Sequence, residues 1–258
     1  MVKRTLNERE LKEFLEEKVI QYNRPSFIEH DPVSIPHHFS RKEDIEIAGF
    51  LAATIAWGQR PVIIRNANHF MELMDLSPYE FVLSASPKEI KRLETFVHRT
   101  FNGTDAKFFI LALRNIYKKH NGLENVFAQN FSSAQNSIIH FRKTFLSLKH
   151  DKRSDKHISD PGSNSSAKRI NMFLRWMVRQ DNAGVDFGIW KSISPALLHV
   201  PLDVHVGNVA RKLGLLERKQ SDWKAVEELT MKLRELDEED PVKYDFALFG
   251  LGIFEGFK

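Results

Sequence analysis

Apolar residues recur at helical spacing along almost the whole chain, and this periodicity is the strongest constraint on the fold. Over residues 6–22, Leu11, Phe14, Leu15 and Val19 fall on one helical face among Glu and Lys. The same pattern predicts further helices at 61–74, 105–120, 133–148, 165–179, 203–213 and from residue 240 onward. No segment alternates apolar and polar residues long enough to predict a sheet. The fold class that we expect is therefore all-α.

Helix starts are marked by three Ser-x-x-Glu sequences, at Ser40–Glu43, Ser77–Glu80 and Ser86–Glu89. In a capping box of this kind, the Ser and Glu side chains bond the free amides of the first turn. Two of the three also have Pro at the first helical position, which helices accept there. A short helical turn is also predicted at 187–193.

Composition excludes several classes of site. The chain has 258 residues and no Cys, so disulfides, thiolate zinc sites, cysteine-held iron–sulfur clusters and cysteine nucleophiles are excluded. No run approaches the ~20 apolar residues of a membrane span, and the charged start lacks the apolar core of a signal peptide. We therefore expect a soluble protein, cytoplasmic or associated with the nucleoid, and neither a cofactor nor a metal.

Positive charge is concentrated in the middle of the chain. Between Phe141 and Asp181, ten Lys and Arg accompany four Asp, whereas the whole chain carries a net charge of only +4. A basic region of this kind is typical of a surface that binds a polyanion. The ordinary alternative is a solvated helix surface beside a charged loop.

Lys168 and Asp203 are the candidate chemical residues. Lys168 is expected in the first turn of a helix that follows the polar loop 149–166, where free amides attract phosphate and an amine can act as a nucleophile. Asp203 is expected to begin another helix. The ordinary alternatives are a surface lysine and a plain N-cap. A metal site of His199, Asp203 and His205 is disfavoured because no further carboxylates surround it in sequence.

Two segments resemble helix-hairpin-helix DNA glycosylases of the endonuclease III type. Lys168–Leu174 resembles the helix that their catalytic lysine opens, and Pro201–Arg211 resembles the element that carries their catalytic aspartate. Upstream, Leu51–Gln59 resembles a helix that ends in a DNA-probing glutamine. The resemblance extends loosely over residues 45–256 and is most specific over 165–211.

The resemblance has departures. The segment Pro161–Lys168 lacks the second glycine of the family's hairpin, which puts the phosphate grip in doubt. The 35-residue interval from Lys168 to Asp203 is similar to that of the archaeal-type oxoguanine glycosylases. The whole chain is nearest to a bacterial family known only as a domain of unknown function.

The resemblance implies a base-excision repair enzyme that acts, as a monomer, on double-stranded DNA. A damaged base, with an oxidised purine as one candidate, is flipped out and attacked by Lys168 with help from Asp203, and β-elimination can follow. Other roles are implied for two groups of residues. The base pocket would contain Trp57, Gln59, Phe173 and Trp176, and DNA would be bound by Lys152, Arg153, Lys156, Ser165, Ser166, Arg169 and His205.

Two helical subdomains are implied as well. Residues 41–180 would form a central bundle that contains the degenerate hairpin, and residues 1–40 with 181–258 would form the second. Two alternatives stay open: a non-catalytic nucleic-acid-binding protein on the same fold, and a helical protein-interaction module.

Overall fold

The computed structural model describes residues 7–129 and 131–257, and in that part of the chain almost all regular structure is helical. The expected all-α class is confirmed. The predicted first helix included Leu6, which lies outside the described residues. The helices are α1 (Glu8–Tyr22), α2 (Lys42–Thr54), α3 (Arg60–Leu73), α4 (Pro78–Ser84), α5 (Pro87–Lys91), α6 (Gly103–Lys119), α7 (Leu123–Ala128), α8 (Ala134–Phe145), α9 (Lys168–Val178), α10 (Val204–Lys212), α11 (Trp223–Leu236) and α12 (Tyr244–Phe254).

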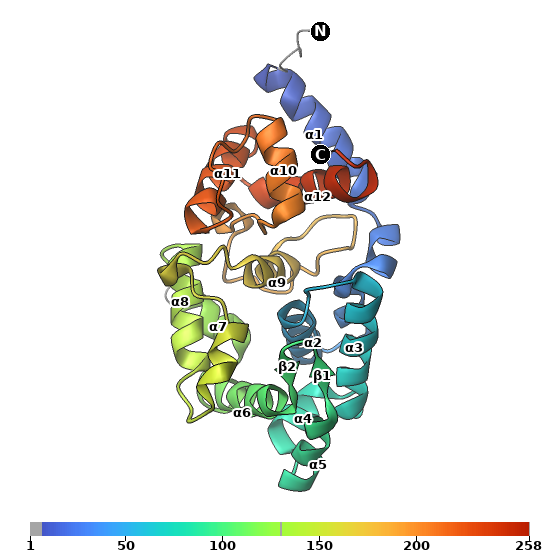
Figure 1. Cartoon of the computed structure of the whole chain (residues 1–258), viewed down its shortest axis with the longest axis vertical. Helices are drawn as coiled ribbons and strands as arrows, with labels where there is room; N and C mark the ends of the chain where they lie inside the picture. Colours follow the sequence, from blue (N-terminus) through green and yellow to red (C-terminus); the bar gives the residue numbers. More distant parts are fainter. Residues whose placement is uncertain (1–6, 130, 258) are drawn as a thin grey trace.

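The helices gather into two bodies, with α9 between them (Figure 1). The central body contains α2 to α8, and the C-terminal body contains α1 with α10, α11 and α12. Helix α1 packs on α12, α12 packs on α10, and α9 packs on α2 of the central body. Buried apolar side chains of both bodies form one continuous core. The division into residues 41–180 and 1–40 with 181–258 stays a prediction.

Of the three predicted capping boxes, one is present in the structure and two are absent. The box of Ser86 and Glu89 is present. At Ser40 it is absent, because α2 begins one residue later and Arg41 occupies the N-cap without a side-chain bond. Ser77 is the N-cap of α4 but makes no side-chain cap bond, and Glu80 instead accepts a hydrogen bond from the Ser84 hydroxyl at 3.0 Å.

Two local predictions were incomplete or wrong. A two-residue antiparallel pair, β1 (Val97–His98) with β2 (Phe101–Asn102), was not predicted because each strand is too short to show alternation. The helical turn predicted at 187–193 is wrong. The amides of Phe187 and Trp190 instead bond the carbonyls of Trp176 and Met177, so this segment closes the end of α9.

No helix in the described ranges is long and apolar enough to cross a membrane.

Candidate active site

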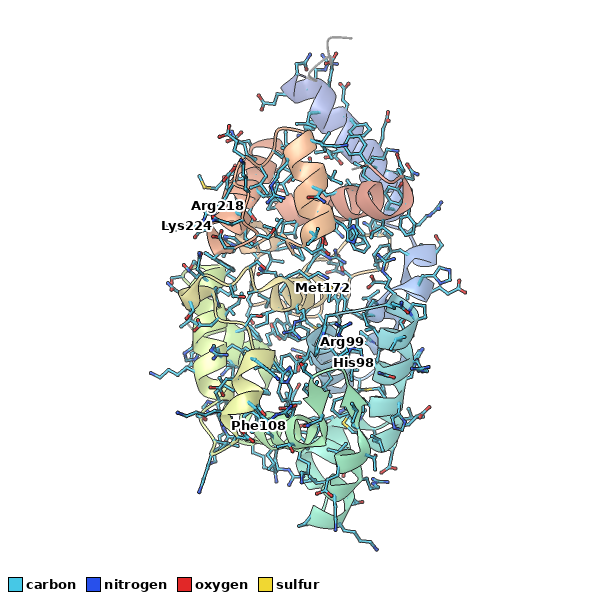
Figure 2. All side chains as sticks on the ribbon, viewed as in Figure 1. His98, Arg99, Phe108, Met172, Arg218 and Lys224 are labelled. Carbon is cyan, nitrogen blue, oxygen red and sulfur yellow. The ribbon has the colours of Figure 1, made fainter. Side chains whose placement is uncertain are left out.

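Helix α9 presents one of its faces to a cavity between the two bodies. Lys168, Met172 and Arg175 lie on this face, at the i, i+4 and i+7 spacing of neighbouring helical turns, and all three line the cavity. Figure 2 labels Met172 on α9, where the two bodies meet. Lys168 is the first residue of the helix, and Ala167 before it adopts a left-handed conformation with φ 46°. Lys168 therefore enters the cavity at the N-terminal end of α9.

Asp203 is the N-cap of α10, and its two carboxylate oxygens have different partners. Oδ1 accepts a hydrogen bond from the Val206 amide at 3.0 Å. Oδ2 lies 3.6 Å from Nζ of Lys168. The Lys168 side chain is 26% exposed and that of Asp203 is 21% exposed, so both stay accessible from the cavity. The capping role and the lysine contact are therefore compatible in one residue.

The cavity that these residues share has a volume of about 590 Å³. Most of its wall is apolar. The apolar part is formed by Phe27, Pro32, Ala56, Trp57, Ile63, Met172, Pro201, Val204, Phe249 and Ile253. Volumes of ~300–1,000 Å³ with a few polar groups in an apolar wall are typical of small-molecule sites.

An indole–guanidinium stack forms one side of the cavity. The Arg169 guanidinium lies 4.8 Å from the centre of the Trp57 ring. It also donates to the carbonyls of Thr54 and His157. Burial lowers the pKa of Arg169 to about 10. Trp57 and Arg169 both line the cavity, but the Arg169 guanidinium is bonded within the chain, so its expected contact with DNA stays a prediction.

A buried ionic group lies about two turns beyond Lys168 along α9. Arg175 donates to Asp186 at 3.2 Å and also to Asp245, and these carboxylates are almost fully buried. Burial raises the pKa of Asp245 to about 6, and the nearby Asp203 charge acts in the same direction, against Arg175 and Lys168. Burial also raises the pKa of Asp31, which likewise lines the cavity. The cavity therefore contains three carboxylates within a largely apolar wall.

The structure corrects part of the expected base pocket. Phe173 and Trp176 are fully buried, and neither belongs to the cavity wall. Phe173 packs against Phe50 and Trp190 in the core. Gln59 is exposed as the N-cap of α3 and is likewise absent from the wall. Of the four residues expected in the base pocket, Trp57 lines the cavity.

The residues expected to bind DNA are placed in different ways. Lys152 and Lys156 are exposed, and His205 is exposed at the cavity rim. Arg153 instead donates to the Asp105 carboxylate at 2.5 Å and to the Thr100 carbonyl at 3.0 Å, so its guanidinium fastens the loop to α6. Lys152 and Lys156 are therefore more available than Arg153 to contact a polyanion.

Hydrogen bonds to Asp160 close the segment that was expected to act as a hairpin. Asp160 accepts hydrogen bonds from the Gly162 amide and the Ser163 hydroxyl, both at 2.9 Å, and its carbonyl accepts from the Ser165 amide at 3.1 Å. The Ser166 carbonyl accepts from the Asn171 side chain at 3.1 Å. Several polar groups that could have bound phosphate here are therefore occupied within the chain.

Sequence reasoning missed Asp31, Arg60 and Asp245, which all line the cavity. Asp245 had a signal, because it is a lone carboxylate in the apolar run Tyr244–Leu251. Asp31 and Arg60 had none, since in sequence each is an ordinary charged residue directly before a proline. No group of three or more His, Asp or Glu in the described ranges is placed to hold a metal ion.

A family model described as "Protein of unknown function (DUF2400)" matches residues 31–254 of the chain. The matched range includes Lys168, Asp203 and all of the cavity wall except Phe27. No curated protein and no solved structure matches the chain.

Proposed function

The chain belongs to the DUF2400 family, and we propose from its cavity that it is a DNA base-excision glycosylase. The observation that carries the proposal is the Lys168–Asp203 pair, with Nζ and Oδ2 3.6 Å apart on a shared cavity wall. These residues are 35 positions apart in the chain and come from the starts of two different helices. An amine beside a carboxylate, next to an aromatic wall, is what attack on a flipped nucleotide requires.

The proposed reaction uses the neutral amine of Lys168, which forms when the ammonium gives one proton to solvent. Nζ attacks C1′ of the deoxyribose, a C1′–N bond forms, and the bond to the base breaks with its electron pair. One amine proton goes to the departing base. The sugar ring then opens, its O4′ takes up a proton from solvent, and a protonated imine links the sugar to Nζ. Asp203 stabilises the positive charge that develops on the sugar before the new bond is complete.

Strand cleavage would follow from the same imine. Loss of a proton from C2′ and departure of the 3′ phosphate break the C3′–O bond by β-elimination. The resemblance to helix-hairpin-helix glycosylases supports this chemistry, because Lys168 and Asp203 correspond to the family's lysine and aspartate. The same resemblance also supports a helix-hairpin-helix fold around α9.

Borohydride trapping tests the proposal. Duplexes that each carry one damaged base are incubated with the protein and borohydride, which reduces the imine to a stable amine. We expect a covalent protein–DNA product with at least one lesion, and none with Lys168→Gln, which keeps a polar side chain of similar reach but cannot form an imine. Lys88→Gln, which changes an exposed lysine on α5 outside the cavity, is the control.

A non-catalytic nucleic-acid-binding protein is the second candidate. The exposed side chains of Lys152 and Lys156 favour it, because they can contact phosphates whether or not the cavity is catalytic. Tight duplex binding without base release or trapping for any lesion would favour this candidate and would remove the glycosylase.

A further inference from the structure

Most charged groups of the cavity already have partners. Lys168 is paired with Asp203, and Arg175 is bonded to Asp245. The Arg169 guanidinium donates to two backbone carbonyls and stacks on the Trp57 ring. Each of these cations is therefore fixed in place before any ligand enters.

Arg60 and Asp31 differ from this pattern. The Arg60 side chain makes no hydrogen bond and no ion pair within residues 7–129 and 131–257, and its guanidinium lies 4.6 Å from the centre of the Phe249 ring. Asp31 is only 7% exposed. Its Oδ1 accepts from the Val33 amide at 3.1 Å, whereas Oδ2 has no donor in the same ranges. Both side chains line the cavity. Asp31 Oδ2 can therefore accept a hydrogen bond from a ligand, and the Arg60 guanidinium can donate to it.

We propose that Asp31 and Arg60 select the base, and that they select one with a lactam edge, a carbonyl beside a ring N–H. Asp31 Oδ2 accepts the N–H, and the Arg60 guanidinium, held flat on Phe249, donates to the carbonyl. This inference rests on the proposed function, because a flipped base is the ligand.

The donor and acceptor inventory argues for a lactam over an amidine edge. A guanidinium has five N–H donors and no acceptor, and an ionised carboxylate only accepts. A carbonyl oxygen has two lone pairs for the donor fork, whereas the ring nitrogen of an amidine edge, as in adenine, offers a single lone pair. Asp31 Oδ2 has no donor within the described residues, so it can accept an N–H from either edge, and the lone-pair count at the guanidinium separates the two.

Hypoxanthine and adenine test this directly, because these purines differ in the lactam or amidine edge. Ligand-observed NMR titration of the free bases should show hypoxanthine bound ~10-fold or more tightly than adenine. The preference should disappear in Asp31→Asn and in Arg60→Met. Arg65→Met, which changes an exposed arginine of the same helix outside the cavity, should retain it. Equal binding of both bases by the parent protein, or an unchanged preference in both variants, would overturn the inference.

Trapping at an abasic site separates this inference from the proposed function. An abasic sugar has no base to read, so Asp31→Asn and Arg60→Met should trap there as the parent does, while Lys168→Gln does not trap. Loss of abasic trapping in both variants, with melting temperatures unchanged, would mean that the two residues bind DNA rather than the base, and would overturn the inference. A parent protein that prefers hypoxanthine but never traps would contradict the glycosylase and leave the base-selecting pair in place.

Discussion

Asp203 divides its carboxylate between two tasks. Oδ1 caps α10 through the Val206 amide, and Oδ2 lies 3.6 Å from Nζ of Lys168 on the same cavity wall. An Asp at an N-cap is usually explained by capping alone. Here Oδ2 also contacts Lys168 in the cavity, so capping alone does not explain an aspartate at this position.

Asp203→Asn separates the two tasks. Asn caps helices about as well as Asp, so the free energy of unfolding should change by less than about 1 kcal/mol. A neutral amide cannot offset positive charge on the sugar, so single-turnover base release should fall by ~100-fold or more. Denaturant unfolding and single-turnover assays measure the two quantities. Unchanged base release with unchanged stability would reduce Asp203 to a cap.

The sequence predicted the pair but not the residues around it. Both residues begin helices, but it was the resemblance to helix-hairpin-helix glycosylases that paired Lys168 with Asp203, since a helix start alone is explained by a surface lysine or an N-cap. Phe173 and Trp176 were misplaced because every residue of α9 from Ile170 to Val178 is buried, so periodicity could not identify the face toward the cavity. Lys168, Met172 and Arg175 occupy that face.

At the scale of elements, the start of α9 depends on a contact with a distant helix. The predicted start was residue 165 or 166, and the helix begins at Lys168. Asn164 donates to the Asp222 carboxylate at 3.0 Å, and its carbonyl accepts from the Trp223 amide at 3.2 Å. These bonds hold the chain in a non-helical path before Ala167. A contact across almost 60 residues gives no local signal, so the sequence could not predict this boundary.

The segment before α10 gives the fold a pH dependence. His199 is buried and stacks on Trp223, with ring centres 5.1 Å apart. Burial, aided by the Arg234 charge, lowers the pKa of His199 to about 4. Between about pH 6.5 and pH 4 the unfolded chain therefore binds the proton more readily than the folded one. Stability from this group is present above pH 6.5 and is lost as the pH falls toward 4.

His199→Phe should remove that loss, because Phe keeps an aromatic ring against Trp223 and takes up no proton. Between pH 7 and pH 5, this group should cost the parent protein about 1–2 kcal/mol of unfolding free energy that the variant retains. Denaturant unfolding at the two pH values gives the difference. The same decline in both proteins would assign the acid sensitivity to other groups.

At the scale of the molecule, exposed positive charge lies beside the cavity. Lys152 and Lys156 belong to the 3₁₀ turn Lys152–His157, and the His157 ring stacks on Trp57 of the wall at 5.9 Å. Both lysines are exposed. They are therefore placed to contact the backbone of a duplex whose flipped nucleotide enters the cavity.

The salt dependence of DNA binding tests this footprint. The slope of log K against log salt is about −0.9 for each phosphate neutralised, so Lys152→Gln with Lys156→Gln should reduce it by ~2. The paired control is Lys88→Gln with Lys91→Gln on α5, at the far end of the central body, which should not change the slope (Figure 1). Fluorescence anisotropy over a range of salt measures it. An equal reduction in both pairs would mean that binding follows net charge alone.

The central claim is that Lys168 forms the covalent bond to DNA, and mapping of the trapped product tests it most directly. After borohydride reduction, the product is digested and the modified peptide is identified by mass spectrometry. The account predicts that the sugar remnant is found on Nζ of Lys168. No product with any lesion, or a remnant on another amine such as that of Lys152 or Lys156, would contradict it.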